Sequence, residues 1–552
     1  APFNENNLGQ GLWITHYLKL NGQIDLVGES QLIQKKYGNY DVDDYLVTTQ
    51  FNESLLDATS SGYIERDQQG LGNLYRYNDW SSPVGIIGQP QTTEYAVNDV
   101  LRDGFDSSNP KIITFIGGND GVNSSPIQIA EKWIYGNDND NSWVRLNSTG
   151  TMSPAEGFSM KGTHPPIAAA YDKQNFVFIG KPHNGDIELP LTSGSWYLTG
   201  NPFPSALDAY QFIDDNAGVI DGTIEIWDDW EDNTHLYSEA HAGYAKLTKA
   251  GGIPAVNYNI LTESGGKTPG RYIAVAQGFG VTGAGPSGSK IKFRNAQRKF
   301  VREGSAASVF FKPSSAKQQN NTNTNLDIRL KIRLGFKNEN NFNRQILLTI
   351  DDNATDDIDY GYDAVNNNVL PNDLYWVIDD KKLVIQAIKN LSIERVVPIG
   401  ISANSDIPIK IKVDAVENPY PNMEIYIRDN LTMDTYDILN GVFEITLEDG
   451  EYINEYSMVF KAKPVIPIEI EEKFNELSVF VAEKGSIINV RKPEELQIKN
   501  ILLFNVIGQQ IKIWESNLNE NEIELPVEVS SGFYLVLIST NEGNISKKII
   551  IN

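Results

Sequence analysis

The chain has 552 residues and a formal net charge of −26, with 46 lysine and arginine residues against 72 aspartate and glutamate residues. This acidity disfavours binding to nucleic acid or adsorption to an anionic membrane surface, because both partners require a basic protein face. Cysteine is absent, which excludes disulfides, thiolate metal sites and a cysteine nucleophile. The length is sufficient for several buried cores, and no apolar run approaches the length of a membrane span.

The N-terminal part reads as short strands separated by turns. Residues 18–26 alternate apolar and polar side chains around an Asn-Gly turn at 21–22, and a further short strand is expected at 32–34. Strands this short, with a turn every few residues, suit the edge of a β-solenoid or a small sandwich. The best candidate for a helix is the short segment 206–214.

Further along the chain, strict period-two alternation at 326–334 predicts a half-buried strand. Apolar runs at 374–378 and 383–386 flank Asp379 to Lys382 and predict a hairpin. More strands are expected at 407–413 and 442–447. The fold class is therefore predicted to be all-β, with β-sandwich and β-solenoid-like regions.

Two polar segments predict the domain boundaries. Residues 317–325 lack apolar side chains, and residues 461–472 combine prolines with glutamates, as expected of an extended tether. We predict an N-terminal β-rich region at 1–316, which contains the possible end of a solenoid and a β domain. A β-sandwich is expected at 317–470, and a small C-terminal β-sandwich at 471–552.

Two aromatic motifs resemble structural corners. Trp80 to Pro83 and Asn201 to Pro204 combine proline, a capping Ser or Asn, and one large aromatic ring. We expect the proline to fix the turn and the ring to fill the core below it. The alternative is an aromatic platform that stacks on sugar rings, which we weigh lower because tryptophan is usually largely buried.

An acidic segment at 351–363 is a candidate metal site. Its carboxylates Asp351, Asp356, Asp357, Asp359 and Asp363 surround a glycine, and calcium requires six to eight closely spaced oxygen ligands. The EF-hand pattern does not fit, so a solvated acidic loop is favoured and Ca2+ is the alternative. The acidic runs at 137–141 and 228–232 are weaker candidates.

No catalytic motif stands out. The five histidines, at positions 16, 164, 183, 235 and 241, do not form a His-Glu-x-x-His helix, and no Gly-x-Ser-x-Gly elbow occurs. Residues Gly265 to Thr268 read as a turn, because the first glycine of a phosphate loop is missing. A carboxylate pair for glycoside hydrolysis remains open, but no pair is nominated. We therefore expect no catalytic residues and no cofactor other than possible Ca2+.

The C-terminal segment carries three ordered motifs, at 504–511, 530–538 and 543–552. They read as an apolar strand with a bend at Gly508, a tight Ser-Ser-Gly turn before a second strand, and a final hairpin that turns near 541–544. This order resembles the type A C-terminal sorting domain of cargo of the type 9 secretion system of Bacteroidetes. The resemblance implies export through the periplasm and outer membrane to the cell surface. It also implies that Ala1 is a mature start or a position inside a longer protein.

The same resemblance implies partners and recognition residues. The expected partners are the translocon, an outer-membrane shuttle barrel, and a sorting peptidase or transpeptidase. The sorting signal would include Gly508, Ser531, Gly532, Phe533, Tyr534, Gly543, Lys547 and Lys548. The opposing interpretation is that the glycines only permit bends and that Phe533 and Tyr534 fill the core.

Several upstream stretches are similar to large secreted surface proteins of flavobacteria that carry this sorting domain. They include residues 28–34, 61–67, 77–85 and 200–205, together with Phe279-Gly280 and residues 292–295; Phe203 and Gly280 depart from the usual residues. We therefore expect a non-enzymatic, adhesin-like surface protein. The alternative is a secreted carbohydrate-binding or polysaccharide-active protein, with surface glycan as a possible partner.

Overall fold

The structure, a computed structural model, describes most of the chain. The described residues are 9–37, 52–164, 173–230, 233–257, 264–303, 308, 327–338, 343–367, 369–404, 408–462, 476–482, 487–505, 510–516 and 518–551. Contacts divide the chain into two compact units, Ala1–Ala462 and Lys463–Asn552. Strands dominate both units, which confirms the all-β prediction.

Helices are few and short in the described residues. They are α1 (Val97–Val100), α2 (Ala209–Asp215) and the 3-10 turns η1 (Glu131–Trp133), η3 (Tyr237–Glu239) and η4 (Asn295–Gln297). The helix expected at 206–214 is confirmed in part: Asp208 caps α2 by accepting a hydrogen bond from the Tyr210 amide, while Ala206–Asp208 form strand β23. Within these ranges, no helix has the length and hydropathy needed to cross a membrane.

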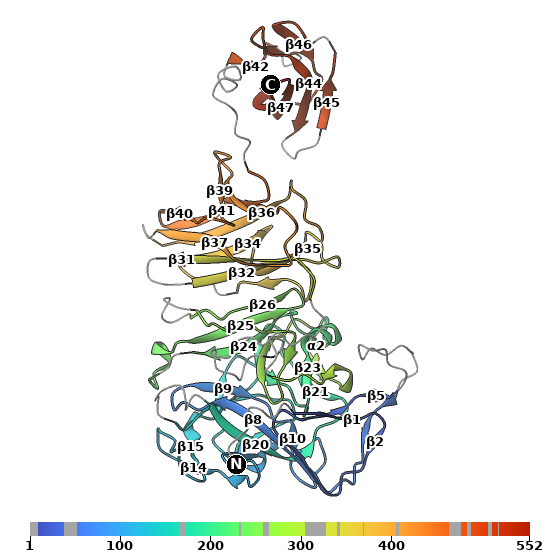
Figure 1. Cartoon of the computed structure of the whole chain (residues 1–552), viewed down its shortest axis with the longest axis vertical. Coiled ribbons are helices and arrows are strands. Elements are labelled where there is room, and N and C mark those ends of the chain that lie inside the picture. The colour runs from blue at the N-terminus through green and yellow to red at the C-terminus, as the bar shows by residue number, and fades with distance from the viewer. Residues whose placement is uncertain are drawn as a thin grey trace. The chain divides into compact units, whose positions relative to one another are not determined.

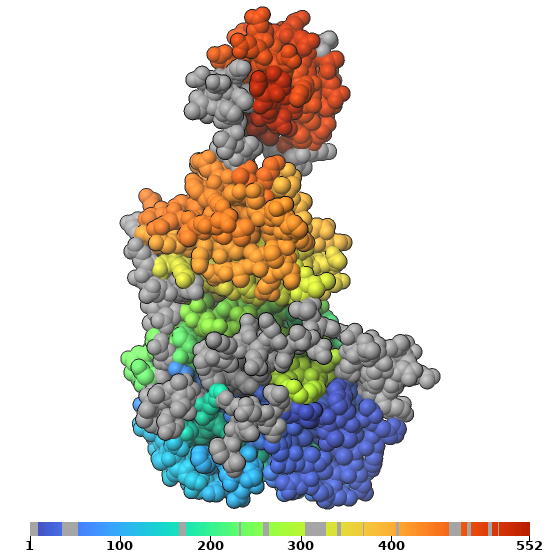
Figure 2. All heavy atoms as spheres, viewed as in Figure 1, coloured from blue at the N-terminus to red at the C-terminus, as the bar shows by residue number. Residues whose placement is uncertain are grey.

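The N-terminal segment stacks two turns of chain in parallel (Figure 1). In the first turn, β1 (Gly11–Ile14), β2 (Tyr17–Leu18) and β3 (Gln23–Leu26) pair in parallel with β4 (Gln31–Gln34), β7 (Leu55–Leu56) and β8 (Tyr63–Leu71) of the second. Such in-register parallel stacking is the defining feature of a β-solenoid. An antiparallel pair, β5 (Lys36–Tyr37) with β6 (Asn52–Glu53), is inserted between β4 and β7. In Figure 2 these residues, in dark blue, form one contiguous surface.

The rest of the first 300 residues forms small, mostly antiparallel sheets. One sheet has the order β13 (Lys111–Ile112), β12 (Leu101–Asp103), β20 (Lys173–Pro182), β8 and β3, with β10 (Val84–Gly85) on β20. Another has the order β17 (Trp143–Arg145), β16 (Tyr135–Asn137), β19 (Phe158–Lys161) and β9 (Tyr77–Trp80). A third has the order β22 (Trp196–Gly200), β28 (Gly278–Thr282), β24 (Ile224–Asp229), β25 (Ala242–Thr248) and β26 (Gly251–Ile253). The shortest ones are β27 (Tyr272–Ile273) with β23 and β30 (Arg298–Lys299), β11 (Tyr95–Ala96) with β18 (Thr151–Met152), β14 (Thr114–Ile116) with β15 (Gln128–Ala130), and β21 (Ile187–Pro190) with β29 (Lys290–Phe293).

The two predicted corners are confirmed as core features. Trp80 and Phe203 are both fully buried. Asn201 organises the second corner, because its Oδ1 accepts a hydrogen bond from the Phe203 amide while its Nδ2 donates to the carbonyls of Ser205 and Ala274. Neither ring is available as a platform for a ligand.

The residues after 330 build one large sheet of 11 strands. Its order is β39 (Thr435–Asp437), β38 (Tyr426–Asp429), β41 (Gly450–Val459), β36 (Val396–Ala403), β34 (Asp373–Ile378), β35 (Lys381–Ile388), β32 (Asn343–Ile350), β31 (Lys331–Asn338), β37 (Ile409–Glu417) and β40 (Phe443–Ile445), with β33 (Ala364–Val365) on β35. The sheet is nearly closed, since the Val413 amide of β37 donates to the Ile438 carbonyl next to β39.

The strands predicted in this sheet are present, with one shifted start. The hairpin is confirmed: β34 and β35 pair through Ile378 and Lys381 around Asp379, which has a φ of 49°. The strand expected at 326–334 begins only at Lys331, and Ile328 is 81% exposed. The strands expected at 407–413 and 442–447 correspond to β37 and β40.

The large sheet shares its core with the preceding region. Ala250, Ile253 and Val256, from β26 and its flanks, belong to the same buried cluster as Leu347 and Trp376. Thr349 donates a hydrogen bond to the Ala250 carbonyl at 2.9 Å. The predicted boundary near 316 lies in 309–326, outside the described residues, and contacts group both sides of it in one unit.

The C-terminal unit is a sandwich of two antiparallel sheets with a core of its own. One sheet is β42 (Ser478–Val481), β43 (Ile487–Arg491) and β46 (Glu522–Pro526); the other is β45 (Gln510–Trp514), β44 (Ile498–Asn505), β47 (Gly532–Thr540) and β48 (Asn544–Ile551). Ile488, Leu503, Val536 and Ile549 are among the residues between them. The predicted boundary near 470 lies in 463–475, outside the described residues.

Candidate functional site

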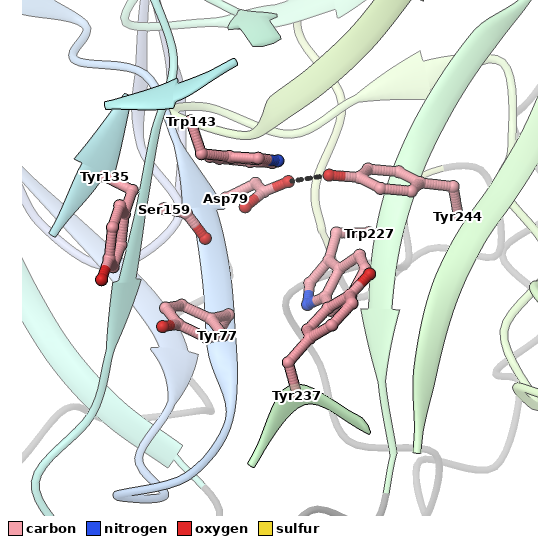
Figure 3. Close-up of a pocket in the computed structure, with 8 residues that line it drawn as sticks. All are labelled: Tyr77, Asp79, Tyr135, Trp143, Ser159, Trp227, Tyr237 and Tyr244. Carbon is pink, nitrogen blue, oxygen red and sulfur yellow. Dashed lines mark hydrogen bonds between the residues drawn. The ribbon is translucent and has the colours of Figure 1, made fainter. Parts of the chain in front are cut away.

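An aromatic pocket of about 300 Å³ opens in the first unit (Figure 3). It begins with strand β9, whose side chains alternate between two faces. Asn78 and Trp80 face the core, where the Asn78 side chain accepts a hydrogen bond from the Leu71 amide. Tyr77 and Asp79 line the pocket on the other face. Period-two geometry thus divides four consecutive residues into two structural and two pocket residues.

Neighbouring strands extend this wall. The register places Ser159 of β19 opposite Asp79, and Tyr135 of β16 opposite Ser159. Trp143 of β17, which lies opposite Asn137, adds a further ring to this wall. The facing wall consists of Trp227 from β24, Tyr244 from β25 and Tyr237 from η3. Figure 3 shows these rings surrounding the Asp79 carboxylate.

Asp79 is the charged group of the pocket and is only 2% exposed. Its carboxylate accepts a hydrogen bond from the Tyr244 hydroxyl at 3.4 Å, and the Ser159 hydroxyl is a second donor. Burial raises the pKa of Asp79 to about 7, because desolvation outweighs these hydrogen bonds. Burial likewise raises the pKa of the Tyr77 and Tyr244 hydroxyls, so both are neutral donors at physiological pH.

The aromatic surface continues beyond the pocket. The Trp227 and Tyr244 rings are 4.9 Å apart, and Tyr244 contacts Trp196 at 5.2 Å. Trp196 in turn lies 5.8 Å from Trp143. This arrangement requires Gly280 below Trp196, because a Cβ at that position would lie 2.4 Å from the indole ring. Gly280, which departs from the related surface proteins, therefore has a local packing role.

Basic side chains flank the pocket on the same face of this wall, because the register places Lys161 opposite Tyr77 and Arg145 opposite Tyr135. The Lys161 ammonium lies 4.4 Å from the Tyr77 ring centre, and the Arg145 guanidinium lies 5.7 Å from that of Tyr135. On the facing sheet, Lys246 forms an ion pair with Glu225 at 2.7 Å. Lys161 and Arg145 thus interact with tyrosine rings, and Lys246 with Glu225. In the part of the chain that the structure describes, no ion pair includes Asp79.

The pocket was not predicted from the sequence. Trp80 to Pro83 was interpreted as a corner, residues 77–85 were noted only for their similarity to surface proteins, and 228–232 only as a weak candidate for a metal site. A usable signal existed on β9, where Tyr77 and Asp79 share one face of a strand whose other face is buried. The partners Tyr135, Trp143, Trp227 and Tyr244 come from separate strands and could not be grouped without the register.

The acidic segment directs its carboxylates toward protein partners. Asp351 pairs with Arg329 at 2.6 Å, and Asp356 with Arg395 at 2.5 Å. Asp359 accepts hydrogen bonds from Thr355, and Asp363 accepts them from the backbone amides of Asp359 and Ala387. Asp357 is exposed. Across the described ranges, no cluster of three or more His, Asp or Glu side chains has a geometry suited to a metal ion. Calcium binding by this segment stays a prediction.

The sorting-signal residues lie on the last two strands. Gly532, Phe533 and Tyr534 begin β47, directly after Ser531, and Lys547 and Lys548 belong to β48, which is an edge strand. Gly543 forms the hairpin turn with a φ of 142°, and Thr540 donates a hydrogen bond from its amide to the Gly543 carbonyl. Gly508 lies outside the described residues.

Phe533 and Tyr534 have different environments. Tyr534 packs against the core and donates a hydrogen bond to the Ser530 carbonyl at 2.7 Å. Phe533 points to the outer face, is 49% exposed, and lies under the Lys548 ammonium at 4.5 Å. The core interpretation is therefore correct for Tyr534 and wrong for Phe533. With Phe504, Leu535 and Leu537, Phe533 lines a groove of about 560 Å³ on the outer face.

The C-terminal sandwich, with its ordered motifs, defines cargo of a bacterial secretion system. A family described as "Secretion system C-terminal sorting domain" matches residues 484–552. The protein is therefore exported through the type 9 secretion system to the cell surface or extracellular space, and it originates from Bacteroidetes.

The larger unit gives the second assignment. The chain belongs to the family described as "Domain of unknown function (DUF8693)", which matches residues 12–460. That match extends across both regions that share the core around Ala250 and Leu347. A comparison with curated proteins finds no match.

Proposed function

We propose that the exported protein is a non-enzymatic, adhesin-like surface protein that holds its ligand in the Asp79 pocket. The observation that carries this proposal is the pocket itself, in which six aromatic rings surround one buried carboxylate. Large aromatic side chains provide most of the binding energy in ligand sites, and few polar groups then fix the orientation. Secretion to the surface would present this pocket to ligands outside the cell.

A carbohydrate ligand is the second candidate. Trp143 is 46% exposed and is followed by Trp196 in the aromatic row that leads into the pocket. Sugar rings present apolar faces that stack on such indoles, and a carboxylate accepts hydrogen bonds from their hydroxyl groups. Paired catalytic carboxylates would be required for hydrolysis, and we propose binding without hydrolysis.

The test uses the full-length chain on glass beads. Beads that carry the wild type or Trp227→Ala are incubated with immobilised surface polysaccharides and with intact cells, and the retained beads are counted. We expect Trp227→Ala to lose retention, whereas Trp514→Ala, in the sorting domain, retains it. Equal retention of Trp227→Ala and wild type would remove the pocket from the adhesive function, and release of reducing sugar would refute the non-enzymatic assignment.

For export, we propose that the groove around Phe533 contacts the translocon or the outer-membrane shuttle barrel. Half-exposed Phe533 and Leu535 (49% and 42% exposed) provide an apolar surface that is costly to leave in water. The edge strand β48 could in addition pair with a strand of the partner. A sorting peptidase or transpeptidase would then act on the segment before the domain. Pull-down of the full-length chain from a native outer-membrane extract should recover the two barrels, and loss of residues 474–552 should abolish the recovery.

A further inference from the structure

We propose that the Asp79 pocket binds a methylated ammonium group. In this assignment the Asp79 carboxylate is the counter-charge, and the rings of Trp143, Trp227 and Tyr244 enclose the methyl groups. This inference rests on the proposed function, whose ligand site it specifies.

The Asp79 carboxylate has no cationic partner among the described residues. A buried carboxylate is normally paired with a cation, because an isolated charge in a low-dielectric site is costly. Asp79 is 2% exposed, yet among the described residues its carboxylate accepts hydrogen bonds only from the neutral hydroxyls of Tyr244 and Ser159. A ligand cation would supply the missing positive charge.

The aromatic faces inside the pocket are suited to a cation. Aromatic rings attract cations through the negative potential of their faces. The protein's own lysine and arginine side chains already use this attraction at Tyr77 and Tyr135. Among the described residues, no lysine or arginine lies over Trp143, Trp227 or Tyr244, whose rings line the interior. These faces remain available to a ligand.

The pocket fits a methylated ammonium group better than a primary ammonium group. A primary ammonium has three N–H donors that each require an acceptor, and the pocket offers one buried carboxylate whose oxygens already accept hydrogen bonds. A quaternary ammonium has no N–H group, so aromatic walls and one negative charge satisfy it completely. A sugar would instead need several partners for its hydroxyls, while the Ser159 and Tyr244 hydroxyls are directed at Asp79.

The experiment titrates the full-length protein with choline and tetramethylammonium chloride at pH 8 and constant ionic strength, by calorimetry and tryptophan fluorescence. The matched neutral probe is 3,3-dimethylbutan-1-ol, which has the shape of choline without its charge. We expect choline to bind at least about tenfold more tightly than this alcohol. Asp79→Asn should lose about tenfold in choline affinity, whereas Asp221→Asn, a half-buried carboxylate outside the pocket lining, should lose none.

Each result has a defined meaning. Equal binding of choline and the neutral alcohol would overturn the inference, since charge would then contribute nothing. Binding of monosaccharides but not choline would also overturn it, while the proposed adhesive function would stand. Equal retention of Trp227→Ala and wild-type beads would refute the proposed adhesive function, whatever the result of the choline titration. Binding to phosphatidylcholine vesicles would identify a lipid headgroup as the source of the ammonium group, and binding of free choline alone would identify a small molecule.

Discussion

Replacing Asp79 with asparagine should stabilise the protein at alkaline pH and leave it nearly unchanged at acid pH. Asparagine has the same shape and keeps an acceptor for the Tyr244 hydroxyl, but it cannot ionise. The folded protein raises the pKa of Asp79 to about 7, against about 3.8 in an unfolded chain. Between these values the folded state holds a proton that the unfolded state has released, so stability falls as the pH rises.

The magnitude follows from the difference between these two pKa values. At about 1.4 kcal/mol for each pH unit, a pKa of about 7 instead of 3.8 corresponds to about 4 kcal/mol. The wild type incurs this cost in full above pH 7 and hardly at all below pH 4. The asparagine variant never incurs it.

The assay is urea unfolding of both full-length proteins at pH 4.5 and pH 8, followed by tryptophan fluorescence, with no methylammonium compound present. Other buried carboxylates, such as Asp363 with a pKa of about 7, affect both proteins equally and cancel. We expect the variant to gain about 3 kcal/mol relative to wild type between the two pH values. A difference that does not change with pH would refute the assignment of Asp79 as a buried, unpaired carboxylate.

Three further predictions test other parts of the chain. Arg344→Ala should lower the free energy of unfolding in urea by about 3–5 kcal/mol, because it leaves Asp373 buried without its bidentate partner at 2.6 and 2.9 Å. The control Arg491→Ala, which removes an exposed ion pair with Glu522, should lower it by under about 1 kcal/mol. EDTA should leave the melting temperature unchanged, since Asp351 and Asp356 already pair with arginines; a lower melting temperature in EDTA would instead support Ca2+ in the acidic segment. Phe533→Ala should reduce surface display, measured by whole-cell labelling, without lowering the melting temperature of the sorting domain. Val536 is fully buried, so Val536→Ala should lower that temperature. Normal display of Phe533→Ala would exclude the groove from recognition.

Local patterns in the sequence predicted local structure well. The hairpin around Asp379 follows from two apolar runs on either side of a polar turn. The final hairpin around Gly543 and the buried corners at Trp80 and Phe203 follow equally from turn chemistry and residue size. The start of β31 was misplaced because alternation continues through Ile328, whose neighbours Asp327 and Arg329 form an ion pair outside the strand.

The pocket depends on long-range register, which alternation does not encode. Ser159 lies opposite Asp79 only because β9 pairs with β19, and Trp227 reaches the same space from a different sheet. Short strands at 18–26 and 32–34 were predicted to form a solenoid edge or a small sandwich, but neither strand β1 nor the pairing of β2 with β7 across an insertion was predicted. Sequence periodicity identifies faces of strands and does not identify which faces meet.

The shared core around Ala250 and Leu347 has a consequence for how such proteins evolve. Neither the region before residue 300 nor the sheet after 330 can be lost, duplicated or exchanged by recombination without exposing apolar residues that the other covers. The sorting domain has a hydrophobic core of its own, so it can be gained or lost as a module. We therefore expect relatives to keep residues 12–460 as one inherited block and to vary in what is joined to it.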